Sequence, residues 1–398
     1  MSNLEFDPVL SPNNQEYPRA AEIVRNLLAP QPVIIGIEGG PCGGKTTLTE
    51  QIVAEAESRG QPVYVLPEVA TKHILKLHEQ GFSIPELAAN DREGYLAFQM
   101  AVLGDINQRL ISAKKEFAGT DTLILSDRLS NRPYITGEEY EELCRRLGYG
   151  PNEVIQNHVD KVIYLPSVAK VAPELYGELQ LTNTARYETL DQAIATCDRT
   201  LSSVAAHPEL HIVADGQDFD AKMRRAKNLA FDNQNEYETK WRPADEVELV
   251  EWIKAKQKAG EVLNSIEIGQ SYHRLPDGTT YRLRAGTGSD GQDFYHFTVK
   301  QRHEYGSREI NRIITEQQYQ TLADQPCQGW LFKKRFVVLD NWQVWHCDFI
   351  MDGDEGFWIV EAEVTCPEEI DNIQCPVAMV DANYFKTEDY ASRNLPRR

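Results

Sequence analysis

A short glycine-rich segment contains residue types that can hold a phosphate group. Residues 39–48 read GGPCGGKTTL and follow the apolar run 32–38, so they lie where a strand would pass into a helix. The spacing G-x-x-x-x-G-K-T is that of a phosphate-binding loop, in which backbone N–H groups and the helix N-terminus face the phosphates. In such a loop the lysine, Lys45, reaches the β- and γ-phosphates and the threonine, Thr46, binds Mg²⁺. The expected nucleotide-binding residues of the loop are Gly39, Gly40, Gly43, Gly44, Lys45, Thr46 and Thr47.

Acids and an arginine at the ends of two later apolar runs would complete this site. Asp127 ends the run 122–128, where a carboxylate can help to hold the metal, and Arg128 beside it would bind an acceptor or a transferred phosphoryl group. Glu68 ends the run 62–68 and is a candidate general base for an acceptor hydroxyl. The alternative for both acids is an ordinary carboxylate that caps the next segment.

Two further side chains are weaker candidates. Gln99, in a long helical segment, would read an acceptor base or amide, and the alternative is an exposed helix residue. Arg186 follows the fourth apolar run, where a lid would supply a cation to the phosphates. A salt bridge at the start of a helix is the alternative for this arginine.

Charged residues also recur at every second position in the C-terminal part of the chain. The stretch EYETKW, residues 236–241, would place Glu236, Glu238 and Lys240 on one face of a strand. Four later strands repeat this spacing, with Arg282 and Arg284, Lys300 and Arg302, Lys333 and Arg335, and Glu361 and Glu363. For any one strand, a solvent-exposed face is the simpler interpretation.

Two features of the whole set favour an interior face instead. The terminal strands are acidic and the middle strands are basic, whereas solvated faces usually mix the signs. The opposite faces are partly apolar, as Val360, Ala362 and Val364 show for the last strand. An eight-stranded barrel has an interior just wide enough for side chains or one small ligand. Basic groups there would grip a linear polyphosphate, and carboxylates would hold a divalent cation.

Two kinds of element must position these residues. Short apolar runs alternate with helical patterns up to about residue 230, which predicts an α/β domain with a parallel sheet. After residue 233 the period changes to two, which predicts an α+β domain built on eight antiparallel strands closed into a barrel, with helices at 243–260 and 316–324. The expected strands of the first domain are 32–38, 62–68, 122–128, 161–165 and 210–215. The expected divisions are an N-terminal extension at 1–29, the domains 30–232 and 233–381, and a tail at 382–398.

Composition excludes several classes of protein. The 398 residues carry a net charge of −20, and a protein with a general nucleic-acid surface usually needs a basic footprint. No long apolar stretch predicts a membrane span, and the first 30 residues do not resemble a secretory signal, so we expect a cytoplasmic protein. The seven cysteines are scattered, which is typical of reduced thiols. Oligomeric state cannot be predicted from these features.

The first domain resembles a known family. The segments GGPCGGKTT, SDR and TARYETLDQA are similar to those of the nicotinamide-riboside-kinase-like AAA domain family, over about residues 30–230. This resemblance implies binding of ATP or GTP with Mg²⁺ by a P-loop kinase or NTPase. The acceptor of such a kinase stays open.

The second domain resembles another family. Glu236 to Lys240 match the E-x-E-x-K signature of the CYTH domain, in the triphosphate tunnel metalloenzyme superfamily, and TTYRLRAG, YHFTVK, FKKRFVV and WHCDFIMDGDEGFWIVEAEV follow in the family's order. The resemblance covers about residues 234–366. Enzymes of this family remove a terminal phosphoryl group from tripolyphosphate, thiamine triphosphate or nucleoside triphosphates with Mg²⁺ or Mn²⁺, and some are adenylate cyclases.

The second resemblance also implies residue roles. The implied metal ligands are Glu236, Glu238, Asp348, Glu361 and Glu363, of which Glu361 or Glu363 would also orient the attacking water. The implied triphosphate-binding residues are Lys240, Arg282, Arg284, Lys300, Arg308, Lys333 and Arg335. The stretch GSREINRIIT departs from the family, because Glu309 is one place out of phase and Asn311 replaces an acid.

The leading hypothesis is a bifunctional enzyme for small nucleotides and polyphosphates, in which a P-loop kinase or NTPase is joined to a metal-dependent triphosphatase. The alternative is a nucleotide-switched binding protein whose barrel holds a polyphosphate or phosphoinositide-like ligand without turnover. The acidic set favours catalysis, while the missing acid at Asn311 favours binding. An adenylate cyclase is less favoured, because the barrel strands contain no clear base-reading element.

Overall fold

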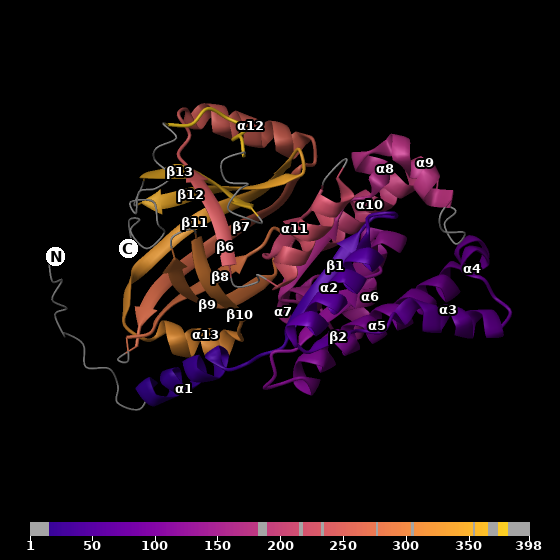
Figure 1. Ribbon diagram of the computed structural model, residues 1–398, viewed down its shortest axis with the longest axis horizontal. Helices are drawn as coiled ribbons and strands as arrows, with labels where there is room; N and C mark the ends of the chain where they lie inside the picture. The colour runs from indigo at the N-terminus through magenta and orange to yellow at the C-terminus, as the bar shows by residue number, and fades with distance from the viewer. Residues whose placement is uncertain are drawn as a thin grey trace.

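The computed structural model describes residues 16–181, 189–214, 218–231, 235–275, 278–303, 306–352, 355–364 and 373–380. Within these residues the chain forms a parallel sheet covered by helices and, beside it, a closed antiparallel barrel (Figure 1). This is the architecture predicted from the sequence. The predicted division at residue 233, the extension at 1–29 and the tail at 382–398 remain predictions, and the tail lies outside the described residues.

The parallel sheet has the strand order β2-β3-β1-β4-β5. Its central strand, β1, pairs with β3 and β4, and almost all of its residues are buried, as expected for a strand covered on both faces. All five strands lie in the predicted apolar runs, except that β1 extends one residue further, to Gly39. They are β1 (Val33–Gly39), β2 (Val63–Val65), β3 (Leu123–Asp127), β4 (Lys161–Leu165) and β5 (Leu210–Ile212).

Helices cover both faces of this sheet. The alternation of side chains along β1 sends Ile34 into a core with α5, α7 and α10, and Ile35 into a core with α2 and α11. The helices up to residue 231 are α1 (Glu16–Leu28), α2 (Lys45–Arg59), α3 (Val69–Glu79), α4 (Ile84–Asn90), α5 (Arg92–Glu116), α6 (Gly137–Leu147), α7 (Glu153–His158), α8 (Val168–Val171), α9 (Pro173–Leu181), α10 (Leu190–Val204) and α11 (Phe219–Phe231), with a 3-10 turn, η1 (Arg132–Tyr134).

The barrel closes in the order β10-β6-β13-β12-β11-β7-β8-β9. Its two helices are α12 (Glu246–Lys258) and α13 (Glu316–Ala323), within or close to the predicted ranges. Its strands are β6 (Asn235–Trp241), β7 (Val262–Arg274), β8 (Thr280–Thr287), β9 (Asp293–His303), β10 (Gly306–Ile313), β11 (Cys327–Asp340), β12 (Gln343–Asp352) and β13 (Glu355–Val364).

Helices cover the outer face of the barrel where it is apolar. Val360 and Ala362 pack outward with Leu249 and Ile253 of α12, as the period-two pattern predicts. Because successive strand residues point to opposite faces, the charged residues between them face the interior.

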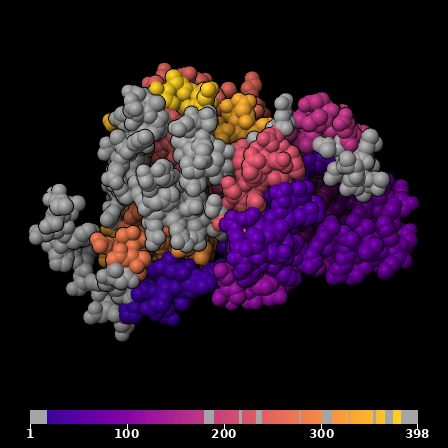
Figure 2. Space-filling view, in the orientation of Figure 1, coloured from indigo at the N-terminus to yellow at the C-terminus, as the bar shows by residue number. Residues whose placement is uncertain are grey.

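The helix α1 packs against the barrel. Its Ala20, Val24 and Leu27 belong to one core with Leu283 of β8 and Leu322 of α13. In the space-filling view α1, in indigo, lies along the lower edge of the molecule, below the orange atoms of the barrel (Figure 2). This part of the predicted N-terminal extension therefore covers part of the barrel.

One end of the barrel rests on the first domain. Asp290, in the turn between β8 and β9, accepts a hydrogen bond from Asn152 Nδ2 at 2.5 Å. Asn264 Nδ2 donates to the carbonyl oxygen of Ala206 at 3.4 Å. Leu263 and Leu339 of the barrel pack against the core that α5, α7 and α10 share with the sheet.

Candidate functional site

The glycine-rich loop has the backbone geometry that a phosphate site needs. Gly44 has φ +96°, a left-handed conformation that suits glycine, and α2 begins at the next residue. A Cβ on Gly39 would overlap the carbonyl oxygen of Leu165, so the loop can lie against the end of β4 only without a side chain there. Lys45 Nζ donates to the carbonyl oxygens of Gly39 at 2.9 Å and Gly40 at 3.3 Å. The lysine therefore lies over the loop at the N-terminus of α2, where anions are favoured.

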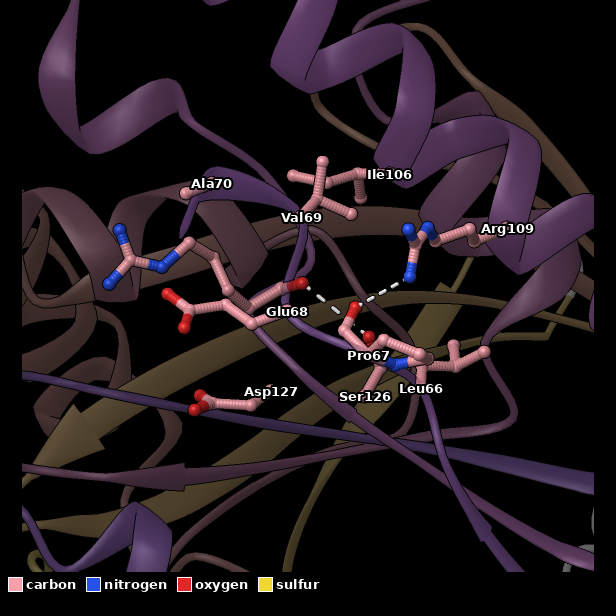
Figure 3. Close-up of a pocket in the computed structure, with 10 residues that line it drawn as sticks. Leu66, Pro67, Glu68, Val69, Ala70, Ile106, Arg109, Ser126 and Asp127 are labelled. Carbon is pink, nitrogen blue, oxygen red and sulfur yellow. Dashed lines mark hydrogen bonds between the residues drawn. The ribbon is translucent and has the colours of Figure 1, made fainter. Parts of the chain in front are cut away.

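A pocket at the C-terminal ends of β2 and β3 contains the candidate acids. It combines carbon-rich walls from Val69 and Ile106 with charged groups. Glu68 and Asp127 project toward the same side of it (Figure 3). Glu68 Oε2 accepts a hydrogen bond from Thr71 Oγ1 at 2.8 Å, so this carboxylate also orients the first turn of α3. Glu68 is the N-cap residue of α3, but its side chain makes no capping hydrogen bond to the backbone, so the capping alternative is not supported and the base role stays a prediction.

Arg128 has an unusual backbone conformation next to the pocket. Its φ is +74°, which is rare for a residue with a side chain. Its guanidinium lies 4.9 Å from the centre of the Tyr134 ring and donates a hydrogen bond to the Tyr134 hydroxyl. The side chain is therefore held at the pocket wall rather than left to move in solvent.

A buried carboxylate that the sequence analysis did not single out fixes this turn. Glu38, the last residue before the glycine loop, is 4% exposed, and its Oε1 accepts a hydrogen bond from the backbone N–H of Leu129 at 2.5 Å. Burial raises the pKa of Glu38, while the Leu129 hydrogen bond and the nearby Arg128 and Lys45 oppose that rise. An acid at the end of an otherwise apolar strand was the available signal. Glu38 is a positioning residue that joins the loop to the Asp127–Arg128 turn.

The two weaker candidates of this domain have different outcomes. Gln99 is buried, not exposed, and both its backbone oxygen and its Oε1 accept from Asn131 Nδ2, at 2.7 and 2.8 Å. Its amide thus holds the segment after β3 in place. Arg186 lies outside the described residues.

The interior of the barrel contains a buried network centred on Arg335. Its guanidinium donates to both oxygens of Asp348, at 2.7 and 2.8 Å, and to Glu361 Oε2 at 2.6 Å. The same group lies 3.0 Å from Nδ1 of His346. Lys333 forms a further ion pair with Asp348. Arg335 and Asp348 lie directly opposite each other on β11 and β12, so the strand register creates the pair.

Lys240 extends this network on the next strand. Its Nζ lies 2.5 Å from Glu361 Oε1 and 2.9 Å from Glu238 Oε2. Glu361 therefore lies between Lys240 and Arg335, two cations from different strands. Lys240, the lysine of the E-x-E-x-K stretch, meets Glu361 because β6 pairs with β13.

The network explains how so many charges can be buried. Burial alone would raise the pKa of Asp348, but Arg335 and Lys333 hold it at about 2. Glu361 likewise has a pKa well below its usual value, because Lys240, Lys333 and Arg335 outweigh the effect of burial. Burial and the nearby Arg335 lower the pKa of Lys333 to about 8. Buried charges are tolerable when paired and hydrogen-bonded in this way.

The opposite wall of the interior holds the other arginines. Arg282 Nη2 donates to Thr298 Oγ1 at 3.2 Å, and Thr298 Oγ1 donates to Asn311 Oδ1 at 2.6 Å. Asn311, which replaces an acid expected from the family, thus still acts as an acceptor on this wall. Arg284 lies opposite His296 in the strand register. The side chains of three predicted ligands are outside the described part of the structure, namely Glu236, Lys300 and Arg308.

The carboxylates of the barrel interior are suitable ligands for a divalent cation, although among the described residues no three potential ligands are grouped together. Glu238 and Glu363 lie directly opposite each other on β6 and β13, and carboxylate oxygens are the ligands that Mg²⁺ and Mn²⁺ prefer. Among the side chains that the structure describes, no three His, Cys, Asp or Glu are grouped to hold a metal. Asp348 has both oxygens engaged by Arg335, so metal binding there would require the pair to separate.

One comparison with known proteins concerns the first domain. Residues 34–218 match a family model described as an AAA domain. This matching part of the chain is called the AAA domain from here on. The glycine loop, the buried Glu38 and the pocket around Asp127 all lie within the AAA domain. None of the curated proteins matches the chain.

Solved structures similar to part of the chain include three of interest. An inorganic triphosphatase, NE1496, is 16% identical, with 40% of this chain and 92% of that chain covered and a TM-score of 0.26. A putative adenylyl cyclase from Hippeastrum, described as having a dominant triphosphatase activity, is 14% identical, with 34% and 83% covered and a TM-score of 0.26. The PH1012 protein from Pyrococcus horikoshii OT3 is 19% identical, with 34% and 84% covered and a TM-score of 0.26.

The AAA domain and the barrel thus bring most of the predicted site residues into two clusters. In the AAA domain, Lys45, Asp127 and Arg128 surround Glu38 closely enough to influence its pKa. In the barrel, the predicted site residues that face inward are Glu238, Lys240, Arg282, Arg284, Lys333, Arg335, Asp348, Glu361 and Glu363. No helix in the described ranges has the length and apolar character needed to cross a bilayer.

Proposed function

We propose that the chain is a phosphate enzyme with two sites, an AAA domain that binds ATP or GTP and a barrel that hydrolyses a linear triphosphate. The observation that carries this proposal is the buried network in which Arg335 joins Asp348 and Glu361. Such a network is a costly way to stabilise a fold, because apolar side chains of similar volume usually serve as well. Its charges suit a polyanion and a cation instead.

In the AAA domain, Lys45 would bind the β- and γ-phosphates, while Thr46 and Asp127 would hold Mg²⁺. Glu68 would accept the proton of an acceptor hydroxyl, and Arg128 would bind the phosphoryl group from the pocket wall. The apolar wall at Val69 and Ile106 suits an acceptor with a carbon framework. Whether this domain is a kinase or an NTPase depends on that acceptor.

In the barrel, Arg282, Arg284, Lys333 and Arg335 would bind the phosphate oxygens and stabilise the charge that develops on them. Bound Mg²⁺ or Mn²⁺, held by Glu236, Glu238 and Glu363, would polarise the phosphoryl group and the attacking water. Glu361 or Glu363 would orient this water, and the proton of the water would pass to the released phosphate. We assign Asp348 to the positioning of Lys333 and Arg335 rather than to the metal, because both of its oxygens accept hydrogen bonds from Arg335.

A second candidate is a barrel that binds its ligand without turnover. It is supported by the amide of Asn311, at a position where the resemblance to the CYTH family implies an acid. Substrates would then be tripolyphosphate-like or phosphoinositide-like ligands, and the AAA domain would act as a nucleotide switch. For either function we propose a cytoplasmic location, since no disulfide joins the cysteines of the described part.

The first test separates the two sites in the full chain. Lys45→Ala should abolish nucleotide turnover or binding by the AAA domain, because the P-loop loses its phosphate-binding cation. Mg²⁺-dependent hydrolysis of tripolyphosphate should continue at the parent rate, as measured by phosphate release. A folded Lys45→Ala protein that has lost both activities equally would refute the two-site proposal.

The second test separates catalysis from binding in the barrel. Replacing both Glu361 and Glu363 by Gln should remove tripolyphosphate hydrolysis, by about 10²-fold or more, while calorimetry still detects binding to the arginines. A matched control is the double change of Glu251 and Glu355 to Gln, two exposed acids of the same domain. Unaltered turnover in the Glu361 and Glu363 variant would count against catalysis. Binding without turnover in the parent would select the second candidate.

A further inference from the structure

Three side chains form a row across adjacent strands inside the barrel. Gln270 of β7 lies opposite Arg284 of β8, and Arg284 lies opposite His296 of β9. Gln270 is fully buried and His296 is 6% exposed. The row faces inward, because the outward residues of the same strands, such as Leu283 and Phe297, pack in the core under α13 and α1.

Two polar atoms of this row have unmet hydrogen-bonding capacity. Among the described residues, no partner reaches Gln270 Oε1 or His296 Nε2, although both atoms are buried. The neighbouring row is different, because Arg282, Thr298 and Asn311 are joined by hydrogen bonds. A buried polar atom without a partner costs free energy of folding, so such atoms usually belong to a site that binds something polar.

On β7 and β9 the interior becomes apolar beyond the row. Ile266, Ile268, Phe294 and Val337 form a cluster there. This is the end of the barrel that contacts the AAA domain, where the turn at Asp290 and the side chain of Asn264 are bonded to that domain. The charged residues Lys333 and Arg335 of β11 lie opposite Ile268 and Ile266, so the apolar cluster borders the charged network on one side and the row on the other. A linear anion that followed β7 and β9 as far as the row would meet the apolar cluster at its end.

The chemistry of the row suits the end of a phosphate chain. Arg284 supplies a cation, while Gln270 and His296 supply neutral polar atoms. Burial and the nearby Arg284 lower the pKa of His296 to about 3, so its ring is neutral at ordinary pH. A terminal phosphoryl group offers three outer oxygens and can carry a proton, whereas a phosphate inside a chain or ring offers two and has a neighbour on each side. Arg284 as one charged partner, with the neutral Gln270 and His296, therefore favours a terminal phosphoryl group over a phosphate inside a chain or ring.

From these observations we infer that Gln270, Arg284 and His296 form the subsite for the terminal phosphoryl group of a linear polyphosphate. Gln270 and His296 are then specificity residues, and the apolar cluster behind them is a stop that rejects rings and the interior of long chains. This inference rests on the proposed function of the barrel.

The test uses the full chain carrying Lys45→Ala, which removes phosphate binding at the AAA domain. Binding of linear tripolyphosphate and of cyclic trimetaphosphate, each with Mg²⁺, is measured by calorimetry for this parent and for added Gln270→Leu or His296→Leu. The parent should bind the linear form about tenfold or more tightly than the ring, and each variant should lose about tenfold for the linear form only. The controls are Gln320→Leu on α13 and His78→Leu on α3, both at exposed positions.

Melting temperatures without ligand distinguish a ligand site from a structural role. Gln270→Leu and His296→Leu each remove a buried polar atom without a partner, and Gln270→Leu loses in addition only a long hydrogen bond, 3.4 Å, from Nε2 to the Tyr272 hydroxyl, so both variants should melt at or above the parent temperature. Unchanged affinity for tripolyphosphate in both variants would overturn the inference, as would an equal loss for the linear and cyclic forms. A parent that binds neither form would overturn the proposed function of the barrel together with this inference.

Discussion

At the scale of single residues, Asp348 balances two cations that have little access to water. Its side chain is 1% exposed, and Arg335 and Lys333 both bind it. Asp348→Asn keeps the shape but leaves these cations with one negative charge fewer. We expect the free energy of unfolding to fall by about 3–5 kcal/mol, the usual cost of breaking a buried ion pair. Chemical denaturation of the full chain measures it.

Asp121→Asn is the matched control for this prediction, because Asp121 is exposed. The control should change the free energy of unfolding by less than about 0.5 kcal/mol. If Asp348→Asn also changed the free energy of unfolding by less than about 0.5 kcal/mol, the prediction that this ion-pair network stabilises the fold would be wrong.

Residue types and spacing predicted much of these sites. The glycine spacing located the P-loop, and period two identified which charged residues share the interior. Which acid meets which base depends on strand register, as in the pairing of Arg335 with Asp348, and register is a property of the folded sheet. Glu38 was missed because its role depends on the backbone N–H of Leu129, far away in the sequence.

At the scale of elements, α1 packs against residues that are far from it in the sequence. Leu27 is 8% exposed in the core with Leu283 and Leu322, whereas its neighbour Leu28 is 36% exposed. Leu27→Ala should lower the free energy of unfolding by about 2–5 kcal/mol, because it removes buried methyl groups and leaves a cavity. Leu28→Ala should change it by less than about 0.5 kcal/mol.

Denaturation of the two full-length variants tests this prediction. Equal effects of the two substitutions would mean that α1 does not support the barrel. The existence and type of the strands were predicted from periodicity. The docking of α1 was not, because an amphipathic pattern shows that a face is buried without showing what covers it.

At the scale of the whole molecule, buried histidines should make the fold sensitive to mild acid. Burial lowers the pKa of His207 and of His273 to about 4, and burial with the nearby Arg284 lowers that of His296 to about 3. These rings stay neutral in the folded protein below about pH 6.5, where they are protonated in the unfolded chain. The unfolded state then binds more protons, so the free energy of unfolding falls as the pH falls from about 6.5 toward 4.

Denaturation at several pH values, together with proton uptake on unfolding, measures this effect. Burial also lowers the pKa of His346 to about 3 and that of His211 well below its usual value. Each of these five histidines contributes at most about 1.4 kcal/mol per pH unit within that window, and about five protons should be taken up near pH 5. The buried Glu38 has a raised pKa, so its contribution has the opposite sign and reduces the total slightly. A free energy of unfolding that stayed constant between about pH 7 and pH 5 would contradict the prediction.

The path of the chain has a consequence for its biosynthesis. The helix α1 leaves the ribosome before the AAA domain, but the barrel residues that cover Val24 and Leu27 are among those made later. About 250 residues separate the two, which corresponds to on the order of 10 to 50 seconds of translation. The AAA domain can fold during that interval, while the apolar side of α1 cannot yet meet the barrel. The earliest helix of the chain is thus one of the last to be packed, and the nascent protein carries an uncovered apolar face until its barrel is complete.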